Sequence, residues 1–114
     1  MFVETKKEGE VTAPETWREL LLRAADEIER RGHAKRVMQD DYGQVCFWGA
    51  LNYADHGHPQ FPTSNLAIQA SENFCAWRRG DMANPDSSNI TWNDAPWRSG
   101  LEIVATMRAC AREQ

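Results

Sequence analysis

The chain has 114 residues, of which 41% are hydrophobic and 26% are charged, and its formal net charge is -4. A chain of this length buries roughly two-thirds of its unfolded surface, so we expect one domain with one core. The acidic balance disfavours a nucleic-acid partner, because phosphates are bound by basic surfaces. No apolar run is long enough to cross a membrane, so we expect no membrane partner either.

The N-terminal sequence and the cysteines indicate a cytoplasmic protein. Residues 1–11 mix charge with glycine, and we expect an extended N-terminal arm before a single helical domain at residues 12–114. The first seven residues lack the charged-then-apolar order of a signal peptide. The cysteines Cys46, Cys75 and Cys110 are odd in number and form no CxxC pair. This pattern predicts three reduced, buried thiols and neither a disulfide nor a zinc site.

The first predicted helix has the strongest pattern in the chain. Thr12 is its expected cap, Pro14 fits the first turn and Glu15 completes a capping box. We expect the helix to run to about Arg31 and to stop at Gly32. Its apolar residues recur at helical spacing and form one stripe. They are Trp17, Leu20, Leu21, Ala24 and Ile28.

A polar connection is expected at residues 33–43, and a short hairpin near residues 36–42 is possible within it. The second helix is expected from Gln44 to residues 55–57. A Gly- and Pro-rich break then leads to a third helix, from about Asn65 to Arg79, capped by Thr63 or Ser64 and ended by a glycine.

Residues 80–98 are expected to form a long loop, which in a small domain is often functional. Ser99 and Glu102 then form a second capping box for a last helix over about 100–112. Its expected buried stripe is Ile103, Val104, Met107, Cys110 and Ala111. The four helices have only one another to pack against. The sequence therefore predicts an all-α, irregular four-helix bundle with a long loop before the last helix.

Two short motifs carry most of the specific information. Gly-x-x-Cys-x-x-Gly-Ala spans residues 43–50, and Trp-Asn-Asp spans residues 92–94. Glycine inside a helix costs about 1 kcal/mol relative to alanine, so Gly49 indicates a close backbone contact. A side chain such as Asn93 or Asp94 accepts hydrogen bonds from backbone N–H groups and fixes a turn. We therefore expect structural roles for Gly43, Cys46, Gly49, Ala50, Trp92, Asn93 and Asp94.

A cysteine-dependent hydrolase or transferase is one possible function. Cys46 is expected in the first turn of a helix, where backbone N–H groups and the helix dipole lower a thiol pKa. Gln44-x-Cys46 at a helix start is also similar to the arrangement in papain-like enzymes, which use a histidine base. His56 and His58 are the available bases. The expected fold lacks the sheet that carries the papain-like histidine, so we favour a protein that is not an enzyme.

Two kinds of binding function are also consistent with the sequence. Tryptophan and arginine are enriched at protein–protein hot spots, so Trp48, Trp97 and Arg98 are the candidate partner surface. A polar pocket near Asn93 and Asp94 is the candidate site for a small ligand. His56 and His58 lack further ligands at a standard spacing, so no metal site is expected. We expect no cofactor.

The ordered motifs resemble a family of small uncharacterised helical proteins of actinobacteria and their phages. The matching residues are 21–25, 43–50, 92–94 and 99–111. The resemblance implies an actinobacterial or phage setting and no catalytic residue. The leading hypothesis is a small cytoplasmic helical protein that binds another protein, as a phage accessory protein acting on a host factor would. A homodimer formed through the same surface is equally compatible with the sequence.

Overall fold

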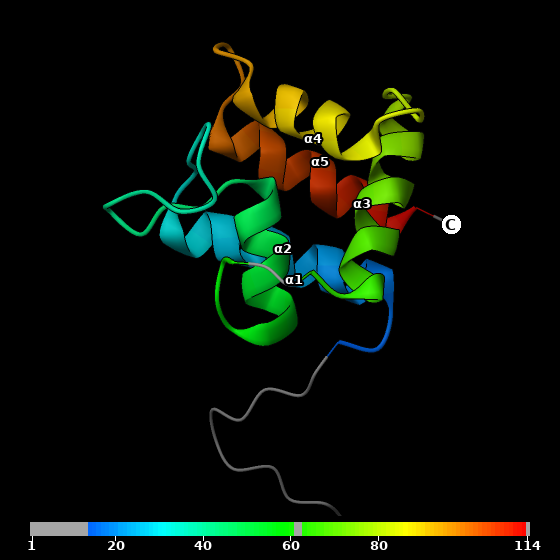
Figure 1. The fold of residues 1–114 in the computed structure, drawn as a ribbon, viewed down its shortest axis with the longest axis horizontal. Helices are drawn as coiled ribbons and strands as arrows, with labels where there is room; N and C mark the ends of the chain where they lie inside the picture. Colours follow the sequence, from blue (N-terminus) through cyan, green and yellow to red (C-terminus); the bar gives the residue numbers. More distant parts are fainter. Residues whose placement is uncertain (1–13, 61–62, 114) are drawn as a thin grey trace, which may run out of the picture.

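A computed structural model describes residues 14–60 and 63–113. The described residues form five helices and no strand (Figure 1). The helices are α1 (Trp17–Arg31), α2 (Phe47–His56), α3 (Asn65–Arg78), α4 (Pro85–Asp94) and α5 (Gly100–Arg112). The all-α class is therefore correct, but the prediction of four helices is wrong, because the expected long loop contains α4.

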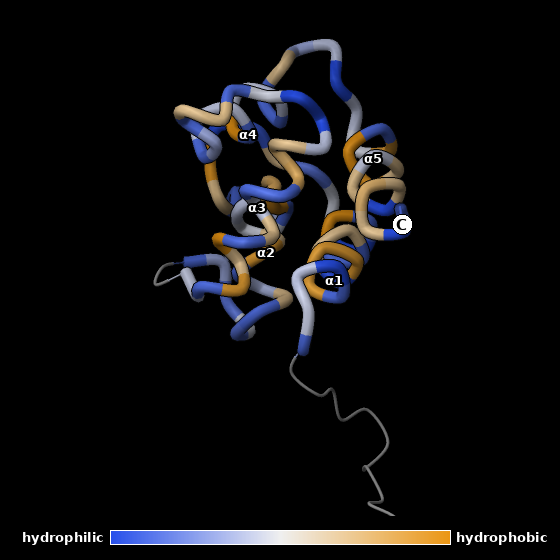
Figure 2. The backbone as a smooth tube through the Cα atoms, turned by 90° about the vertical axis from the view of Figure 1, so that its right-hand side faces the viewer, coloured by the Kyte–Doolittle hydropathy of each residue, from blue (hydrophilic) through white to orange (hydrophobic). Residues whose placement is uncertain are grey.

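Helix α1 is the centre of the packing. It lies against α5, α2 and α3, while α4 packs on α3 and α2. Figure 2 shows α1 and α5 side by side, with the other three helices on the opposite side of the molecule. The core between them consists of aliphatic and aromatic side chains that are almost fully buried. Its largest members are Phe47, Phe74, Leu20, Leu21, Ile28, Leu51, Ile103 and Met107.

The start of α1 differs from the sequence prediction. Thr16 is the N-cap, and its side chain accepts a hydrogen bond from the backbone N–H of Glu19 at 3.1 Å. Thr16 and Glu19 have the spacing of a capping box, four residues after the expected one. Pro14 and Glu15 precede the helix, and Thr12 lies outside the described residues, as does the predicted arm at 1–11. The helix ends at Arg31, as predicted.

Helix α4 is the element that the sequence prediction missed. Pro85 occupies its first turn, where the missing N–H of proline costs nothing. The N-cap Asn84 makes no side-chain hydrogen bond to the helix, and only Asn89 and Asn93 of α4 are buried. Because the buried side chains are amides, α4 has no apolar stripe that a sequence pattern could reveal.

The last helix matches the prediction closely. The Ser99 hydroxyl accepts a hydrogen bond from the N–H of Glu102 at 3.1 Å, and the helix ends at Arg112. All five residues of the predicted stripe are buried. In α3, Ser64 is the N-cap and Arg79 ends the helix in the left-handed conformation, one residue before the expected glycine. Trp77 of α3 remains 36% exposed at the edge of the core.

The connection between α1 and α2 is a compact turn. The N–H of Gly43 donates to the carbonyl of Asp40 at 3.1 Å, and Gly43 has a φ of +82° that favours glycine. Isolated bridges join Val45 to His33 and to Gln39. In place of the possible hairpin near 36–42, the chain therefore forms a turn with single bridges.

Candidate functional site

Cys46 lies at the junction between this turn and α2. It is the N-cap of α2 and not a residue of its first turn, and its Sγ accepts a hydrogen bond from the N–H of Gly49 at 3.4 Å. Its own N–H donates to the carbonyl of Met38 at 3.2 Å. A Cβ at position 49 would lie 2.0 Å from that carbonyl oxygen. Cys46 and Gly49 therefore hold the Met38 carbonyl against the start of α2, the first through a hydrogen bond and the second by its lack of a side chain. Ala50, the last residue of the motif, is fully buried in the core.

Asn93 joins three separate segments of the chain. Its Oδ1 accepts hydrogen bonds from the N–H of Phe47 at 3.0 Å and from Nε2 of His33 at 2.8 Å. Its Nδ2 donates to the carbonyl of Ala34 at 3.2 Å and to Oδ1 of Asp94 at 2.8 Å. This oxygen of Asp94 also accepts from the N–H of Arg36 at 2.9 Å. The Asn-Asp motif therefore holds the end of α4 against the start of α2.

His33 is a participant that the sequence prediction missed. Because Asn93 Oδ1 also accepts from a backbone N–H, Nε2 of His33 must be the donor in their hydrogen bond. Burial lowers the pKa of His33, although the hydrogen bond to Asn93 opposes that shift. The available signal was its position directly after Gly32, the residue at which α1 ends.

Trp92 lies between two guanidinium groups. The Cζ atoms of Arg78 and Arg98 are 4.8 Å and 4.7 Å from its ring centroid. Arg98 also donates from Nε to the carbonyl of Trp92 at 2.7 Å and forms an ion pair with Glu102. Arg98 thus stabilises the turn between α4 and α5.

The three predicted partner-binding residues do not form one surface. Arg98 is engaged within the fold, Trp48 is 6% exposed and Trp97 is 77% exposed. The loop that carries Trp97 is held by Nζ of Lys35, which donates to the carbonyl of Ala95 at 2.7 Å. Trp97 is therefore presented to solvent from a fixed loop.

The predicted cysteine enzyme lacks the geometry that it needs. Cys46 precedes α2 and His56 ends it, which separates them by about 15 Å at 1.5 Å per residue. The ring centroids of His56 and His58 lie 4.1 Å apart, so both histidines are at the far end of the helix. Burial raises the pKa of the Cys46 thiol, and the N–H groups of Gly49 and Trp48 only partly offset it. The expected lowering of this pKa at the helix start is therefore wrong.

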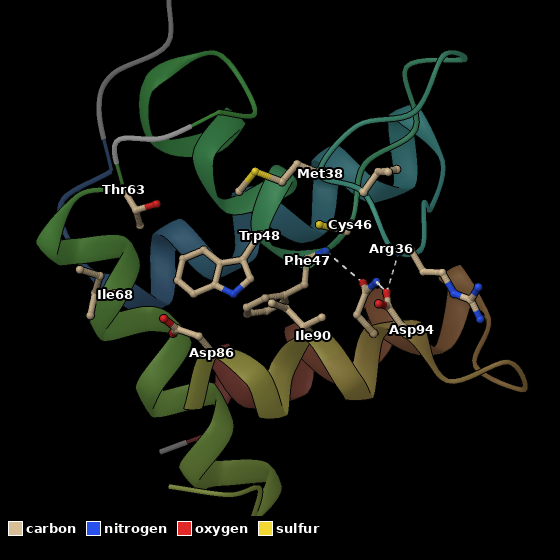
Figure 3. A pocket seen from close by; sticks show the side chains of 12 residues that line it. Arg36, Met38, Cys46, Phe47, Trp48, Thr63, Ile68, Asp86, Ile90 and Asp94 are labelled. Carbon is tan, nitrogen blue, oxygen red and sulfur yellow. Dashed lines mark hydrogen bonds between the residues drawn. The ribbon is translucent and has the colours of Figure 1, made fainter. Parts of the chain in front are cut away.

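An apolar groove lies beside Cys46. Its volume is about 490 Å³, and it lies between α2, α3, α4 and the segment 36–38 (Figure 3). Its walls are mostly apolar, and three of its side chains, Val37, Ile68 and Ile90, are 47%, 40% and 46% exposed. The remaining lining residues are Arg36, Met38, Cys46, Phe47, Trp48, Thr63, Asp86, Asn93 and Asp94.

Charged groups lie at two places along this groove. Asp86, Ile90 and Asp94 recur every four residues on α4 and so share one face, with the two carboxylates about 12 Å apart along the helix. Figure 3 shows Asp86 beside the indole of Trp48, and Asp94 beside Arg36 at the other end. Arg36 has a φ of 70°, a left-handed conformation that is held by its N–H bond to Asp94.

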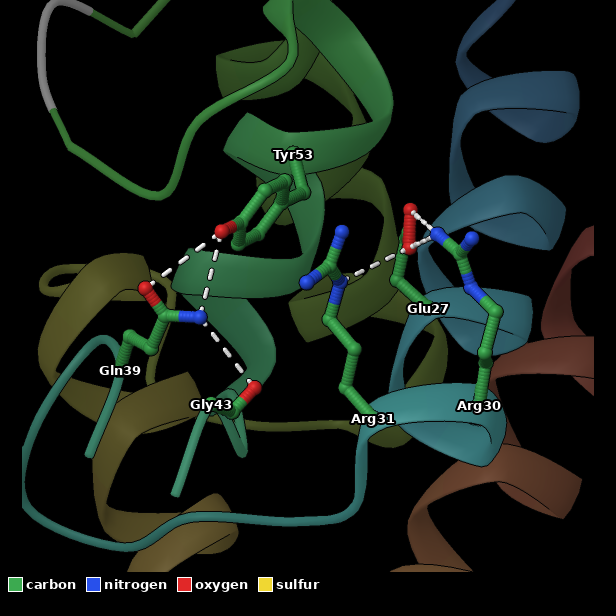
Figure 4. Close-up of polar contacts among 6 residues, drawn as sticks. All are labelled: Glu27, Arg30, Arg31, Gln39, Gly43 and Tyr53. Atoms are coloured by element: carbon green, nitrogen blue, oxygen red, sulfur yellow. Dashed lines mark hydrogen bonds and ion pairs between the residues drawn. The ribbon is translucent and has the colours of Figure 1, made fainter. Parts of the chain in front are cut away.

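A second recess, of about 510 Å³, lies between α1 and α2 and is lined mostly by charged side chains. Glu27 pairs with Arg30 and Arg31, and the Arg31 guanidinium lies 3.7 Å from the ring centroid of Tyr53 (Figure 4). The Tyr53 hydroxyl is bound in turn by Gln39. These contacts tie α1, α2 and the turn together. The apolar groove is the candidate site because exposed apolar side chains gather in it.

The described residues contain no group of three or more His, Cys, Asp or Glu side chains that could hold a metal ion. Cys46, Cys75 and Cys110 are all buried and free. Among the described helices, none combines the length and the apolar character that crossing a membrane requires.

Residues 12–113 match the model of a family of unknown function, DUF6197. The chain belongs to this family. The match covers the whole helical domain, including both motifs and every residue that lines the groove. Comparisons with curated proteins and with solved structures gave no match.

Proposed function

We propose that this member of DUF6197 acts by binding another protein, and that the apolar groove is where it does so. The observation that carries the proposal is the exposure of Val37, Ile68 and Ile90 around one recess, whose deeper wall is Phe47 and Trp48. Exposed apolar side chains that gather in a concave surface are typical of sites for partner segments.

The groove modifies the predicted partner surface. Trp48 remains in it, as part of the wall. Trp97 is a separate exposed side chain in the loop between α4 and α5, and Arg98 stabilises the fold through its contacts with Trp92 and Glu102. Tryptophan in a fixed loop contributes contact area at little entropic cost, so Trp97 is a second contact point for a large partner.

The setting that we propose is the actinobacterial or phage cytoplasm. It rests on the resemblance of the ordered motifs and on the size and acidity of the chain. Within that setting, the specific form of the proposal is a phage accessory protein that acts on a host factor.

The enzyme and small-ligand hypotheses receive less support. A cysteine hydrolase or transferase requires an exposed thiolate near a histidine, whereas Cys46 is 9% exposed with a raised pKa. A small-ligand site at Asn93 and Asp94 requires free polar atoms, whereas the oxygen and the nitrogen of the Asn93 amide are both bonded within the fold. The cysteine hypothesis thus lacks the group on which it depends. At the Asn93–Asp94 motif, only the second oxygen of Asp94 makes no hydrogen bond with the described residues.

The experiment is affinity capture from an actinobacterial lysate, with quantitative mass spectrometry, on three immobilised proteins. They are the wild type, Ile90→Asp in the groove and the matched control Leu101→Asp, whose leucine is 81% exposed outside the groove. We expect a protein that is enriched on the wild type and on Leu101→Asp and lost on Ile90→Asp. If no captured protein distinguishes Ile90→Asp from Leu101→Asp, the groove is not the interaction site.

A further inference from the structure

We infer that the occupant of the groove is a short segment of a partner protein that carries a cationic side chain next to a bulky apolar one. The inference rests on the proposed function and specifies the chemistry of the partner. The cation is recognised by Asp86, and the apolar side chain lies on Ile68, Ile90 and the indole of Trp48.

Asp86 is a carboxylate without a partner among the described residues. It is exposed at the rim of the groove, in the first turn of α4, and it makes neither a hydrogen bond nor an ion pair with any of them. Of the two carboxylates that line the groove, Asp94 accepts hydrogen bonds from Arg36 and Asn93, whereas Asp86 accepts none from the described residues. A lysine or arginine of a partner would meet in Asp86 an acceptor that no described cation occupies.

Next to Asp86, the indole of Trp48 offers a second recognition element for the partner segment. Its indole is 6% exposed, and its N–H has no acceptor among the residues that the structure describes. In Figure 3 the ring lies between Ile68, Asp86 and Ile90, which also line the groove. The indole nitrogen is not among the fully buried polar atoms without a partner, so a group bound in the groove can reach it and act as its hydrogen-bond acceptor. The backbone carbonyl of a bound peptide provides one, together with apolar contact on both isoleucines.

The opposite end of the groove fixes the direction of the segment. One oxygen of Asp94 already accepts hydrogen bonds from the backbone N–H of Arg36 and from the Asn93 amide. Asp86 accepts no such bond from the described residues, so we expect the cation of the segment at the Asp86 end of the groove. The two ends are about 12 Å apart along α4, which an extended peptide of about four residues spans.

The test starts with a phage-displayed library of random eight-residue peptides, selected on the wild-type protein. Binding of the enriched synthetic peptides is then measured by fluorescence anisotropy on Asp86→Lys, on Ile90→Asp and on Trp48→Phe. Asp41→Lys is the matched control, because Asp41 is exposed on the turn outside the groove and makes no side-chain hydrogen bond within the described part of the chain. Circular dichroism confirms that each variant is folded.

We expect the enriched peptides to share a lysine or arginine within about four residues of an aromatic or aliphatic side chain. Asp86→Lys should lower the affinity of these peptides at least about ten-fold, because it removes a close charge pair. Asp41→Lys removes no such pair and should lower the affinity less than about two-fold. Trp48→Phe should weaken them roughly three- to ten-fold through the lost hydrogen bond. Replacing the peptide cation by glutamate should restore binding to Asp86→Lys.

Four other results would overturn the inference, and they differ in what they mean for the proposed function. Peptides that depend on Ile90 but carry no cation, or that bind Asp86→Lys as well as Asp41→Lys, would overturn the inference and leave the groove as a protein site. Failure to enrich any peptide that depends on Ile90 would overturn both. A dimer in sedimentation that Ile90→Asp dissociates would make a second copy the occupant and would also overturn the inference.

Discussion

Asn93 is the residue on which the junction of α1, α2 and α4 depends. It is 1% exposed and satisfies the N–H of Phe47 and the carbonyl of Ala34, two groups far from it in sequence. Asn93→Ala leaves both groups buried without partners, and each such group costs about 1–3 kcal/mol. We expect a loss of about 3 kcal/mol in the free energy of unfolding, measured by urea denaturation.

The matched control for this amide is Asn65→Ala. Asn65 is exposed at the start of α3, and its substitution should change stability by less than about 0.5 kcal/mol. Equal effects of the two substitutions would show that the Asn93 hydrogen bonds add nothing to stability.

Gly49 tests the close approach between α2 and the preceding turn. Replacing a helical glycine by alanine normally stabilises a protein by up to about 1 kcal/mol. Here the new Cβ would lie 2.0 Å from the Met38 carbonyl oxygen, so the turn must move. We expect Gly49→Ala to cost about 3 kcal/mol in urea denaturation, as for overpacked cores.

Gly57→Ala separates this clash from conformational strain. Gly57 has a φ of +89°, and a Cβ there meets nothing within 4 Å, so its substitution should cost only about 1 kcal/mol. A Gly49→Ala protein as stable as the wild type would mean that the approach to Met38 is not rigid.

At the level of single residues, the sequence predicts which positions have a structural role better than it predicts the groups that they contact. The rule that an internal glycine indicates a close contact identifies Gly49, but the partner is a loop carbonyl and not another helix. The sequence also identifies Cys46 as a helix-start residue, yet burial and not the helix dipole dominates its pKa. Partners 46 to 60 residues away along the chain, such as Phe47 and His33 for Asn93, leave no local pattern.

At the level of elements, α4 is the helix that local pattern cannot reveal. Its one fully buried anchor besides Asn93 is Asn89, which donates to the Ser71 hydroxyl at 2.7 Å and accepts a hydrogen bond from Arg78. The other helices carry apolar stripes at helical spacing, and their existence was predictable. In a sequence, asparagine suggests a loop, because it disfavours helices in isolation. The two asparagines that anchor α4 therefore argued against a helix there.

Thr91 provides a direct test of the α4 helix. It is exposed in the middle of α4, so its side chain contributes little to packing. Thr91→Pro removes a helical hydrogen bond and clashes with the preceding turn, which should cost about 3 kcal/mol or more in the free energy of unfolding. Thr91→Ala at the same position should change stability by less than about 0.5 kcal/mol. A harmless proline would indicate that residues 85–94 are a loop, as the sequence suggested.

At the level of the whole molecule, the groove is a product of assembly. Its walls come from the turn before α2, from α2 itself, from the start of α3 and from α4. These segments are separate in the chain, so no single sequence pattern indicates that they line one groove. The two motifs contain Trp48, Cys46, Asn93 and Asp94. Asp86 and Ile90 were missed because α4 was expected to be a loop, whereas Ile68 lies in an expected helix that neither motif includes. The sequence therefore predicted the residues on one side of the candidate site. The residues on α4 were missed because the helix itself was not predicted.

The pH dependence of the free energy of unfolding is a property of the whole molecule. Near neutrality, we expect His33 to contribute to it. The folded-state pKa of His33 is lowered from 6.5, chiefly by burial. The unfolded chain therefore takes up a proton on this histidine more readily than the folded protein does. By linkage, the stability contributed by His33 is fully present above the unfolded pKa and is lost as the pH falls below about 6.5.

We expect the free energy of unfolding to fall between pH 7.5 and pH 5.5 in the wild type and to fall less in His33→Gln. The glutamine keeps an N–H donor for Asn93 but does not titrate. Urea denaturation at several pH values measures both proteins, and the window lies above the range where carboxylates such as Glu29, with its pKa lowered by Arg108, begin to protonate. An equal decline in the two proteins would mean that His33 has the same pKa in the folded and unfolded states, and that other groups cause the decline.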